Sequence, residues 1–148
     1  VARFESITNT TTDGSNLGRF DVWTSSINMF KDHPVTGVGI GQWRTIYEAS
    51  YRLPTENQHL YHAHNNFIQL LGEVGLLGLL GVLIFYGSIV VDNFVVWFKK
   101  RDPYSLCAMI AVICYVFVFG QLEYTLDNSS GIRIMYFMLA TMLQLRDN

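Results

Sequence analysis

The sequence predicts an all-α, polytopic membrane protein, in which a helical extracytoplasmic segment is followed by three transmembrane helices. Half of the 148 residues are hydrophobic, 15% are charged, and the mean hydropathy is +0.23. Residues 1–66 are rich in Asp, Asn and Thr, whereas Leu, Ile, Val, Phe and Met dominate residues 67–148. We therefore expect an extracytoplasmic (periplasmic) loop over 1–66 and a membrane region over 67–148.

The stretch SNLGRFDVWTSSINMFKDHP predicts an amphipathic helix in the first region. Its apolar residues recur at three- and four-residue steps at Phe20, Trp23, Ile27 and Phe30, as one face of an α-helix requires. The glycine-rich stretch VTGVGIGQW predicts a turn, and QWRTIYEASYRL predicts a second short amphipathic helix.

Three apolar runs predict membrane helices over about residues 72–98, 104–122 and 131–146. The first contains Val74–Val91, 18 residues without a charge. At 1.5 Å per residue such a run spans about 27 Å, close to a hydrocarbon core of about 30 Å. The second is an uncharged run of 19 residues, and the third is shorter and is broken by Arg133.

Basic residues set the predicted orientation of these helices. Lys99, Lys100 and Arg101 follow the first helix, whereas the loop after the second, residues 123–130, has no Lys or Arg. Short cytoplasmic loops carry the excess of Lys and Arg, so we expect this first connection and the C-terminus, beside Arg146, to be cytoplasmic. Residues 1–66 then lie on the extracytoplasmic side of the membrane, where ATP and nucleotide sugars are absent.

The bulk composition argues against several classes of protein. A net charge of −2 and a pI of about 6.0 provide no basic footprint for nucleic acid. Cys107 and Cys114 are too few for a disulfide framework or a zinc–cysteine site, and we expect both to be buried small hydrophobes. The chain starts with Val and shows no signal-peptide pattern, so we expect the C-terminal portion of a longer membrane protein.

Three histidines precede the first membrane helix. His59, His62 and His64 are followed directly by Asn65 and Asn66. The spacing leaves open zinc chelation, a polar terminus for the membrane helix, or a general base that accepts a proton from a sugar hydroxyl. We expect no metal, one of these histidines as the base, and His62 and Asn65 as substrate contacts.

Other polar residues are candidates for binding an anionic substrate. Arg19, on the predicted helix that carries Trp23, is either a solvated surface residue or a bidentate ligand for phosphate oxygens. Glu73 either snorkels or orients a polar neighbour, and Arg133 either snorkels or adds positive charge to a pyrophosphate pocket. The glycines at 37–41 follow no predicted strand, so they serve a tight turn or present amides to a phosphate rather than forming a dinucleotide fingerprint.

The order of these motifs resembles the O-antigen ligase family and its O-antigen polymerase relatives. GRFDVWTSSINMFKDHPVTGVGIGQW followed by HAHNNFIQLLGEVGLLGLLG is similar to that family's Arg-x3-Leu-like element, Pro-Thr-Gly linker and His-x10-Gly element. Arg19-x3-Trp23 takes the first place, with Trp instead of Leu, and His64-x10-Gly75 takes the last. The resemblance covers roughly residues 15–98.

The resemblance implies an inverting, metal-independent glycosyltransferase without a cofactor, GT-C-like in fold, in contact with lipid in the bacterial inner membrane. Its donor is a glycan on undecaprenyl pyrophosphate, and its acceptor is lipid A core, another glycan or a protein. Arg19 corresponds to the family's essential Arg and His64 to its essential His, so these are the expected catalytic residues. A second essential Arg and the earlier membrane helices have no counterpart here, so we expect the chain alone to be inactive.

Two alternatives remain. A polysaccharide polymerase of the same superfamily joins repeat units instead of transferring a finished glycan. A non-catalytic transport or assembly module predicts that Arg19 and His64 lie far apart in the fold, whereas the enzyme interpretation predicts that they converge above the bilayer.

Overall fold

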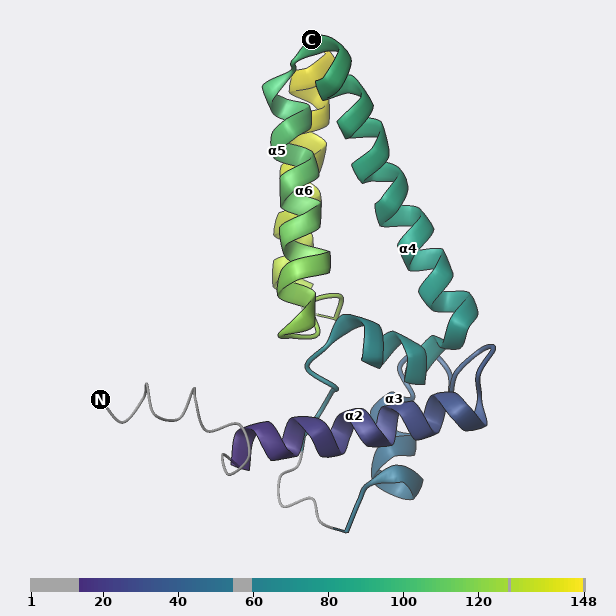
Figure 1. Ribbon diagram of the computed structural model, residues 1–148. Helices are drawn as coiled ribbons and strands as arrows, with labels where there is room; N and C mark the ends of the chain where they lie inside the picture. The colour runs from purple at the N-terminus through teal and green to yellow at the C-terminus, as the bar shows by residue number, and fades with distance from the viewer. Residues whose placement is uncertain (1–13, 55–59, 128, 148) are drawn as a thin grey trace, which may run out of the picture. The chain divides into compact units, whose positions relative to one another are not determined.

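A computed structural model describes residues 14–54, 60–127 and 129–147, and these ranges are helical with no strand (Figure 1). The all-α prediction is therefore confirmed. The helices, including short π and 3-10 segments labelled η, are α2 (Gly14–Asp32), α3 (Trp43–Ile46), η1 (Tyr47–Tyr51), α4 (Asn66–Lys100), α5 (Pro103–Val112), η2 (Ile113–Val118), η3 (Phe119–Gln121) and α6 (Ser129–Asp147).

The chain folds as two compact units, which are described separately. The first contains the described residues up to His64 together with Ile68–Leu77, and the second contains Asn65–Phe67 and the chain from Gly78 onward. Helix α4 contributes residues to both units.

Helix α2 forms where the sequence predicts it, but its buried face is not the one that the aromatic residues mark. Val22, Ser25, Ser26 and Met29 are fully buried, whereas Phe20 is 52% exposed. The hydroxyl of buried Ser26 is satisfied within the helix, because Ser26 Oγ donates to the Val22 carbonyl at 2.8 Å. Small side chains on this face allow neighbouring segments to approach α2 closely.

Helices α3 and η1 form the predicted second amphipathic element and pack on α2. Trp43 and Tyr47 stack with ring centroids 4.7 Å apart, and both are almost fully buried. Trp43 Nε1 donates to Ser26 Oγ at 3.2 Å, and Ser25 Oγ donates to the Tyr51 carbonyl at 2.7 Å. The core of the first unit therefore joins the two helical elements through buried aromatic rings and small hydroxyls.

Helix α4 is broken at Gly75, whose φ of 64° and ψ of −163° are not helical. The amides of Leu76 and Leu77 bond to the carbonyls of Pro34 and Val35 at 2.9 and 3.1 Å, instead of continuing the helix. The helix carbonyls released on the other side of the break, at Gly72 and Glu73, accept from Val38 and Gly39 at 3.0 and 2.8 Å. The turn at 34–39 thus replaces the lost helical bonds on both sides.

This exchange of backbone hydrogen bonds requires glycine on both of the segments that cross. A Cβ on Gly75 would lie 2.5 Å from the Gly37 amide nitrogen and 2.6 Å from the Val35 carbonyl carbon and oxygen. A Cβ on Gly37 would collide with the backbone of Glu73. The glycine of the His-x10-Gly element is therefore the point at which the two backbones cross.

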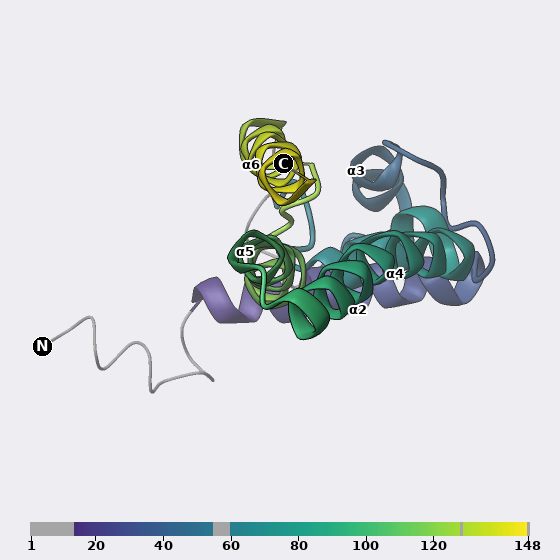
Figure 2. The same ribbon diagram turned by 90° about the horizontal axis from the view of Figure 1, so that it is seen from above.

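In the second unit, α5 and α6 lie side by side in both views (Figure 1, Figure 2), and the second half of α4 packs on them. Buried Tyr86 contacts this helix pair through a hydrogen bond between its hydroxyl and that of Tyr136, at 2.8 Å. Near the C-terminal ends of α4 and α6, Arg146 Nη1 pairs with the Asp92 carboxylate at 2.8 Å. These two ends therefore lie at the same end of the second unit. The apolar core consists of Tyr86, Ala108, Val112, Val116, Met135 and Leu139.

Asn66, the first residue of α4, is a buried polar clamp within the second unit. Its amide nitrogen donates to the Val116 carbonyl at 3.1 Å and to Thr125 Oγ1 at 2.8 Å, and its carbonyl accepts from the Thr125 amide at 2.7 Å. Val116 lies in the π-helical segment η2, where widened helical bonding leaves a carbonyl for an outside donor. The clamp joins residues that no local sequence pattern connects.

Two helical stretches among the described residues are long and apolar enough to cross a membrane, α4 and the continuous run Pro103–Gln121. α6 has the length of a span but is not among them, so its crossing stays a prediction. Cys107 and Cys114 were expected to be buried, and this prediction is wrong, because both are exposed on the α5–η2 run. Their seven-residue spacing places them on the same face of the helix.

Asp102 caps α5 and gives a pH-dependent prediction. Its carboxylate accepts from the Ser105 amide at 2.6 Å, and hydrogen bonding from Ser105 holds the pKa of the Asp102 carboxyl below its ordinary value. The cap therefore stabilises the fold above the unfolded-state pKa of about 4, and its contribution is lost as the pH falls through the lower folded-state value. Asp102→Ala is expected to lower the melting temperature at pH 7, and this deficit is expected to shrink as the pH falls below about 4.

Circular dichroism of the protein in detergent, melted between pH 7 and pH 2, measures this difference. Asp127→Ala, which removes an exposed loop carboxylate, is the control and is expected to change little. An Asp102→Ala deficit of the same size at every pH contradicts the capping argument.

Candidate functional site

Helix α2 is tied to the histidine segment through Trp23. Trp23 Nε1 donates to the Ala63 carbonyl at 2.6 Å, across 40 residues of sequence. Arg19 lies four residues before Trp23 and is partly buried, and residues at this spacing share one face of a helix. The structure therefore joins the face that carries Arg19 to the residue directly before His64.

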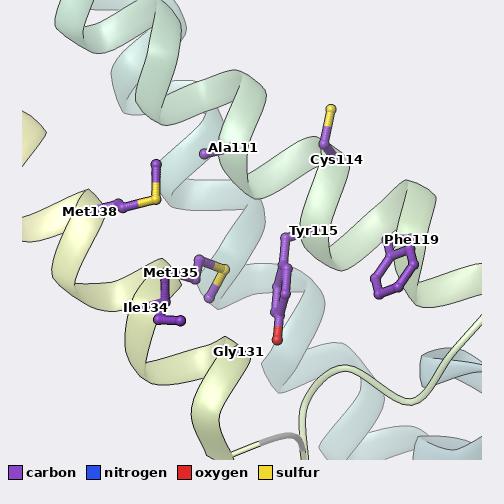
Figure 3. Close-up of a pocket in the computed structure, with 8 residues that line it drawn as sticks. All are labelled: Ala111, Cys114, Tyr115, Phe119, Gly131, Ile134, Met135 and Met138. Atoms are coloured by element: carbon purple, nitrogen blue, oxygen red, sulfur yellow. The ribbon is translucent and has the colours of Figure 1, made fainter.

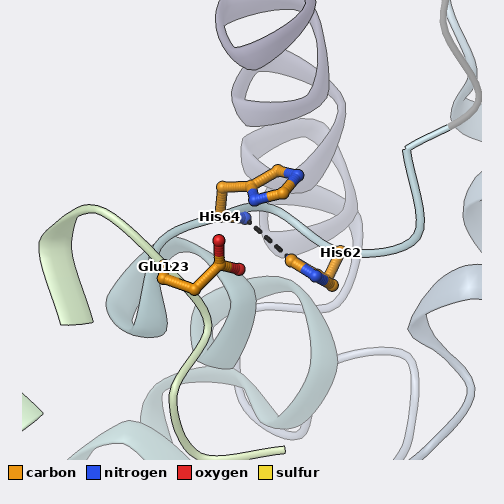
Figure 4. Close-up of side chains that lie close together, drawn as sticks. All are labelled: His62, His64 and Glu123. Carbon is orange, nitrogen blue, oxygen red and sulfur yellow. Dashed lines mark hydrogen bonds between the residues drawn. The ribbon is translucent and has the colours of Figure 1, made fainter. Parts of the chain in front are cut away.

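His64 has a strained backbone and lies against His62. Its φ of 48° is in the left-handed region, which is uncommon for a residue other than glycine and is maintained only where surrounding contacts impose it. The His64 amide donates to His62 Nδ1 at 3.3 Å, and the two imidazoles lie 4.2 Å apart at 58° (Figure 4). Both residues are partly buried, so each keeps part of its surface accessible.

Glu73 is inside the first unit and does not snorkel. It is 8% exposed, its Oε1 accepts from the Gly41 amide, and its Oε2 accepts from Gln69 Nε2 at 3.0 Å. Gln69, 3% exposed, accepts in turn from the Ala63 amide at 2.8 Å. Of the two roles expected for Glu73, the geometry supports orientation of a polar neighbour.

The glycine turn at 37–41 serves the helix break. Gly37, Gly39 and Gly41 all have positive φ, which glycine adopts without strain. The amides of Val38, Gly39 and Gly41 bond to Gly72, Glu73 and the Glu73 carboxylate. Because these donors are directed into the protein, the turn interpretation is favoured over phosphate binding.

The remaining predicted residues lie elsewhere or outside the described ranges. Asn65 belongs to the second unit and is 5% exposed. Its Oδ1 accepts from the Phe67 amide at 2.9 Å, and its nitrogen donates to the Gln121 side chain at 3.2 Å. Arg133 is exposed near the start of α6, and His59 lies outside the described residues. Substrate contacts by Asn65 and Arg133 stay predictions.

A cavity of about 360 Å³ lies in the second unit between α5–η2 and α6 (Figure 3). Cys114, Tyr115, Met135 and Met138 are among the residues that line it. Its accessible lining is almost entirely apolar, so this cavity fits a hydrocarbon group.

Sequence reasoning missed Gln69 and Asn66. A signal for Gln69 was present, since Gln69 and Glu73 are polar residues four apart in an otherwise apolar helix, a spacing at which side chains meet. In the first unit the hydrogen bond from Trp23 to Ala63 joins the helix that carries Arg19 to the segment that carries His62 and His64. His62 and His64 carry the kind of nitrogen that binds zinc, and the role of His64 as a base stays a prediction.

The described residues form an all-helical fold that includes two helices long and apolar enough to cross a membrane, as a membrane protein requires. The chain belongs to the O-antigen ligase family, whose family model matches residues 1–83. It is also similar to the exopolysaccharide production protein ExoQ of Rhizobium meliloti (strain 1021). The two are 27% identical over 136 residues, which cover 84% of this chain and 30% of ExoQ. The chain therefore spans less than a third of the length of this relative, and the resemblance expected from the motifs is confirmed.

Proposed function

We propose that this chain provides the catalytic segment of a membrane glycosyltransferase that transfers a glycan from undecaprenyl pyrophosphate to an acceptor hydroxyl. The observation that carries the proposal is the hydrogen bond from Trp23 to Ala63 at 2.6 Å. It holds the helix face of Arg19 beside the segment of His64, as an enzyme requires and a module with two separate surfaces does not. The matched family region, residues 1–83, includes both residues.

Arg19 binds the pyrophosphate of the donor. The anomeric C–O bond to phosphate breaks during transfer, so negative charge grows on the departing phosphate oxygen. A fixed guanidinium donates two parallel hydrogen bonds to such oxygens and does not lose its proton. Charge stabilisation of this kind acts most strongly when the hydrogen-bond donor, here the guanidinium, is already in place before the reaction.

His64 accepts the proton of the acceptor hydroxyl. The acceptor oxygen attacks the anomeric carbon from the face opposite the pyrophosphate, so the configuration inverts. The new bond joins the acceptor oxygen to that carbon, the electron pair of the broken bond leaves with undecaprenyl pyrophosphate, and the proton resides on the imidazole. Cleavage of the donor's phosphate linkage drives the step, so no nucleotide is needed outside the membrane.

The acceptor distinguishes two versions of this function. A ligase transfers the finished glycan to lipid A core or a protein, whereas a polymerase joins repeat units, so its acceptor is another glycan. The similarity to a protein named for exopolysaccharide production favours the polymerase as the second candidate. In both versions we place residues 1–66 on the periplasmic side of the inner membrane.

The experiment that tests this function uses the intact protein in membrane vesicles with an undecaprenyl-pyrophosphate-linked glycan. Transfer to a hydroxyl acceptor is expected, with release of one undecaprenyl pyrophosphate per glycan moved, and with no loss of rate in EDTA. Lipid A core, free glycan and protein acceptors are supplied separately to identify the preferred class. Failure to transfer to any of them, or abolition of transfer by EDTA, contradicts the proposal.

Replacing Arg19 by lysine tests the phosphate contact. Lysine keeps the charge but cannot form the bidentate bond, so transfer is expected to fall by about 10- to 100-fold, equivalent to one or two tenfold steps of about 1.4 kcal/mol each. Initial rates with the lipid-linked donor measure the effect. Arg44→Lys, at an exposed site paired with Glu48, is the matched control and is expected to leave the rate unchanged, whereas an unchanged rate in Arg19→Lys removes the bidentate role.

A further inference from the structure

A line of hydrogen bonds connects the glycine turn to the histidine segment inside the first unit. It runs from the Gly41 amide to Glu73, from Gln69 to Glu73 at 3.0 Å, and from the Ala63 amide to Gln69 at 2.8 Å. Glu73 and Gln69 are both more than nine-tenths buried. Buried polar groups are high in energy unless paired, so the exchange of any partner in this line affects the others.

The direction of each bond in the line is determined by chemistry. The Ala63 amide is a donor, so the Gln69 carbonyl oxygen faces it and the Gln69 nitrogen faces Glu73. Both carboxylate oxygens of Glu73 then act as acceptors, one from Gln69 and one from Gly41. A carboxylate suits this position because it accepts at both oxygens and donates at neither.

The line ends on the peptide groups that precede His64. Gln69 holds the Ala63 N–H, and Trp23 holds the Ala63 C=O at 2.6 Å. Ala63 is fully buried, so its backbone is anchored from both sides. His64 follows with its left-handed φ of 48°, a conformation that persists only where the surrounding structure imposes it.

We propose that Gln69 and Glu73 are positioning residues that hold the His64 imidazole in its working orientation through the Ala63 backbone. This inference rests on the proposed role of His64 as the base. Neither residue contacts substrate in this account. Their effect is to keep His64 aligned with the acceptor hydroxyl, and misplacement of a catalytic group by about 1 Å can cost about 100-fold in rate.

The sharpest test exchanges the two residues. In Gln69→Glu, two carboxylates face each other, and in Glu73→Gln, an amide nitrogen must face either the Gln69 nitrogen or the Gly41 amide. In the double variant Gln69→Glu/Glu73→Gln, the new carboxylate accepts from Ala63 and from the new amide, whose oxygen accepts from Gly41. Every hydrogen bond of the line is restored, with the charge moved by one helical turn.

Each single variant is expected to lower kcat by about tenfold or more, with the KM for donor unchanged, whereas the double variant recovers to within about threefold of the parent. Melting temperature in detergent is measured for all three, so that a change in kcat is not mistaken for unfolding. Gln69→Met, of similar volume, replaces Gln69→Glu if that variant does not fold. Gln144→Glu, at an exposed position on α6, is the control.

The outcomes separate this inference from the proposed function. Single variants with full kcat overturn the positioning role, and so does a double variant that does not fold or stays as slow as the singles. Recovery in the double variant supports it, even if a single variant is not obtained as folded protein. His64→Ala is assayed in parallel, because full activity there refutes the base itself, whereas an inactive His64→Ala with unaffected Gln69 and Glu73 variants refutes positioning alone.

Discussion

Replacing His64 by alanine is expected to reduce glycan transfer by about 10²- to 10⁴-fold, the usual contribution of a general base. The acceptor hydroxyl then has no imidazole to receive its proton as it attacks the anomeric carbon. Donor binding depends on Arg19 and is expected to persist. The measurement is single-turnover transfer from the undecaprenyl-pyrophosphate-linked glycan, with donor binding determined separately.

Two further variants make the His64 result specific. His64→Asn is expected to be as slow as His64→Ala, although asparagine accepts the left-handed conformation readily, so this variant separates the loss of the base from a change in the backbone. His33→Ala, at an exposed position after α2, is expected to keep the parent rate. Near-parental transfer by His64→Asn contradicts the role of His64 as the base.

Replacing Gly75 by alanine is expected to destabilise the first unit by about 2–6 kcal/mol. The combination of φ 64° and ψ −163° is essentially restricted to glycine and costs an L-residue about 1–3 kcal/mol, and forced overpacking costs about 1–3 kcal/mol more. The overpacking is severe here because the new Cβ would meet backbone atoms of Gly37 and Val35 at 2.5 and 2.6 Å, and neither can rotate away. A loss of this size is a large part of a typical stability of about 5–15 kcal/mol.

Thermal unfolding in detergent and limited proteolysis of residues 14–77 measure the Gly75 effect. Gly81→Ala is the matched control, because Gly81 lies in the same helix with open space around the added carbon. A glycine in a helix interior is destabilising by about 0.5–1 kcal/mol relative to alanine, so Gly81→Ala is expected to be neutral or slightly stabilising. Equal melting temperatures for the two variants contradict the proposed backbone crossing.

The two predictions concern the ends of one motif, the His-x10-Gly element. His64 stands at its first position and Gly75 at its last, and the break at Gly75 returns the chain to the glycine turn that bonds Glu73. Glu73 then reaches back to the histidine segment through Gln69. The spacing of the element therefore reflects a loop of hydrogen bonds that begins beside the imidazole and ends at the helix break.

The expected ranges 72–98, 104–122 and 131–146 overlap α4, α5–η2–η3 and α6. The sequence did not predict that α4 begins at Asn66 or that it is broken at Gly75. It did not predict the buried face of α2, because Ser25 and Ser26 are small polar residues that hydropathy assigns to the surface. They are buried because Trp43, 17 residues after Ser26, packs on them and donates to a hydroxyl.

The candidate site was likewise predicted from the sequence only in part. Arg19 and His64 were identified from motif spacing, but the bond that ties their segments spans 40 residues. Gln69 received no role from sequence, although it holds the peptide before His64. Asn66 was assigned only to the polar stretch near the start of the first membrane helix, whereas it clamps Thr125 across 59 residues.

Sequence by itself determined the helical class of this protein and its apolar segments, because hydrophobic periodicity depends on neighbouring residues along the chain. The family followed from the order and spacing of short motifs. Tertiary structure alone decided the break at Gly75, the buried face of α2 and the partners of Glu73, Gln69 and Asn66. A buried polar group without a hydrogen-bond partner destabilises the fold by about 1–3 kcal/mol. Which residue becomes that partner depends on where distant segments cross, and not on the local sequence pattern.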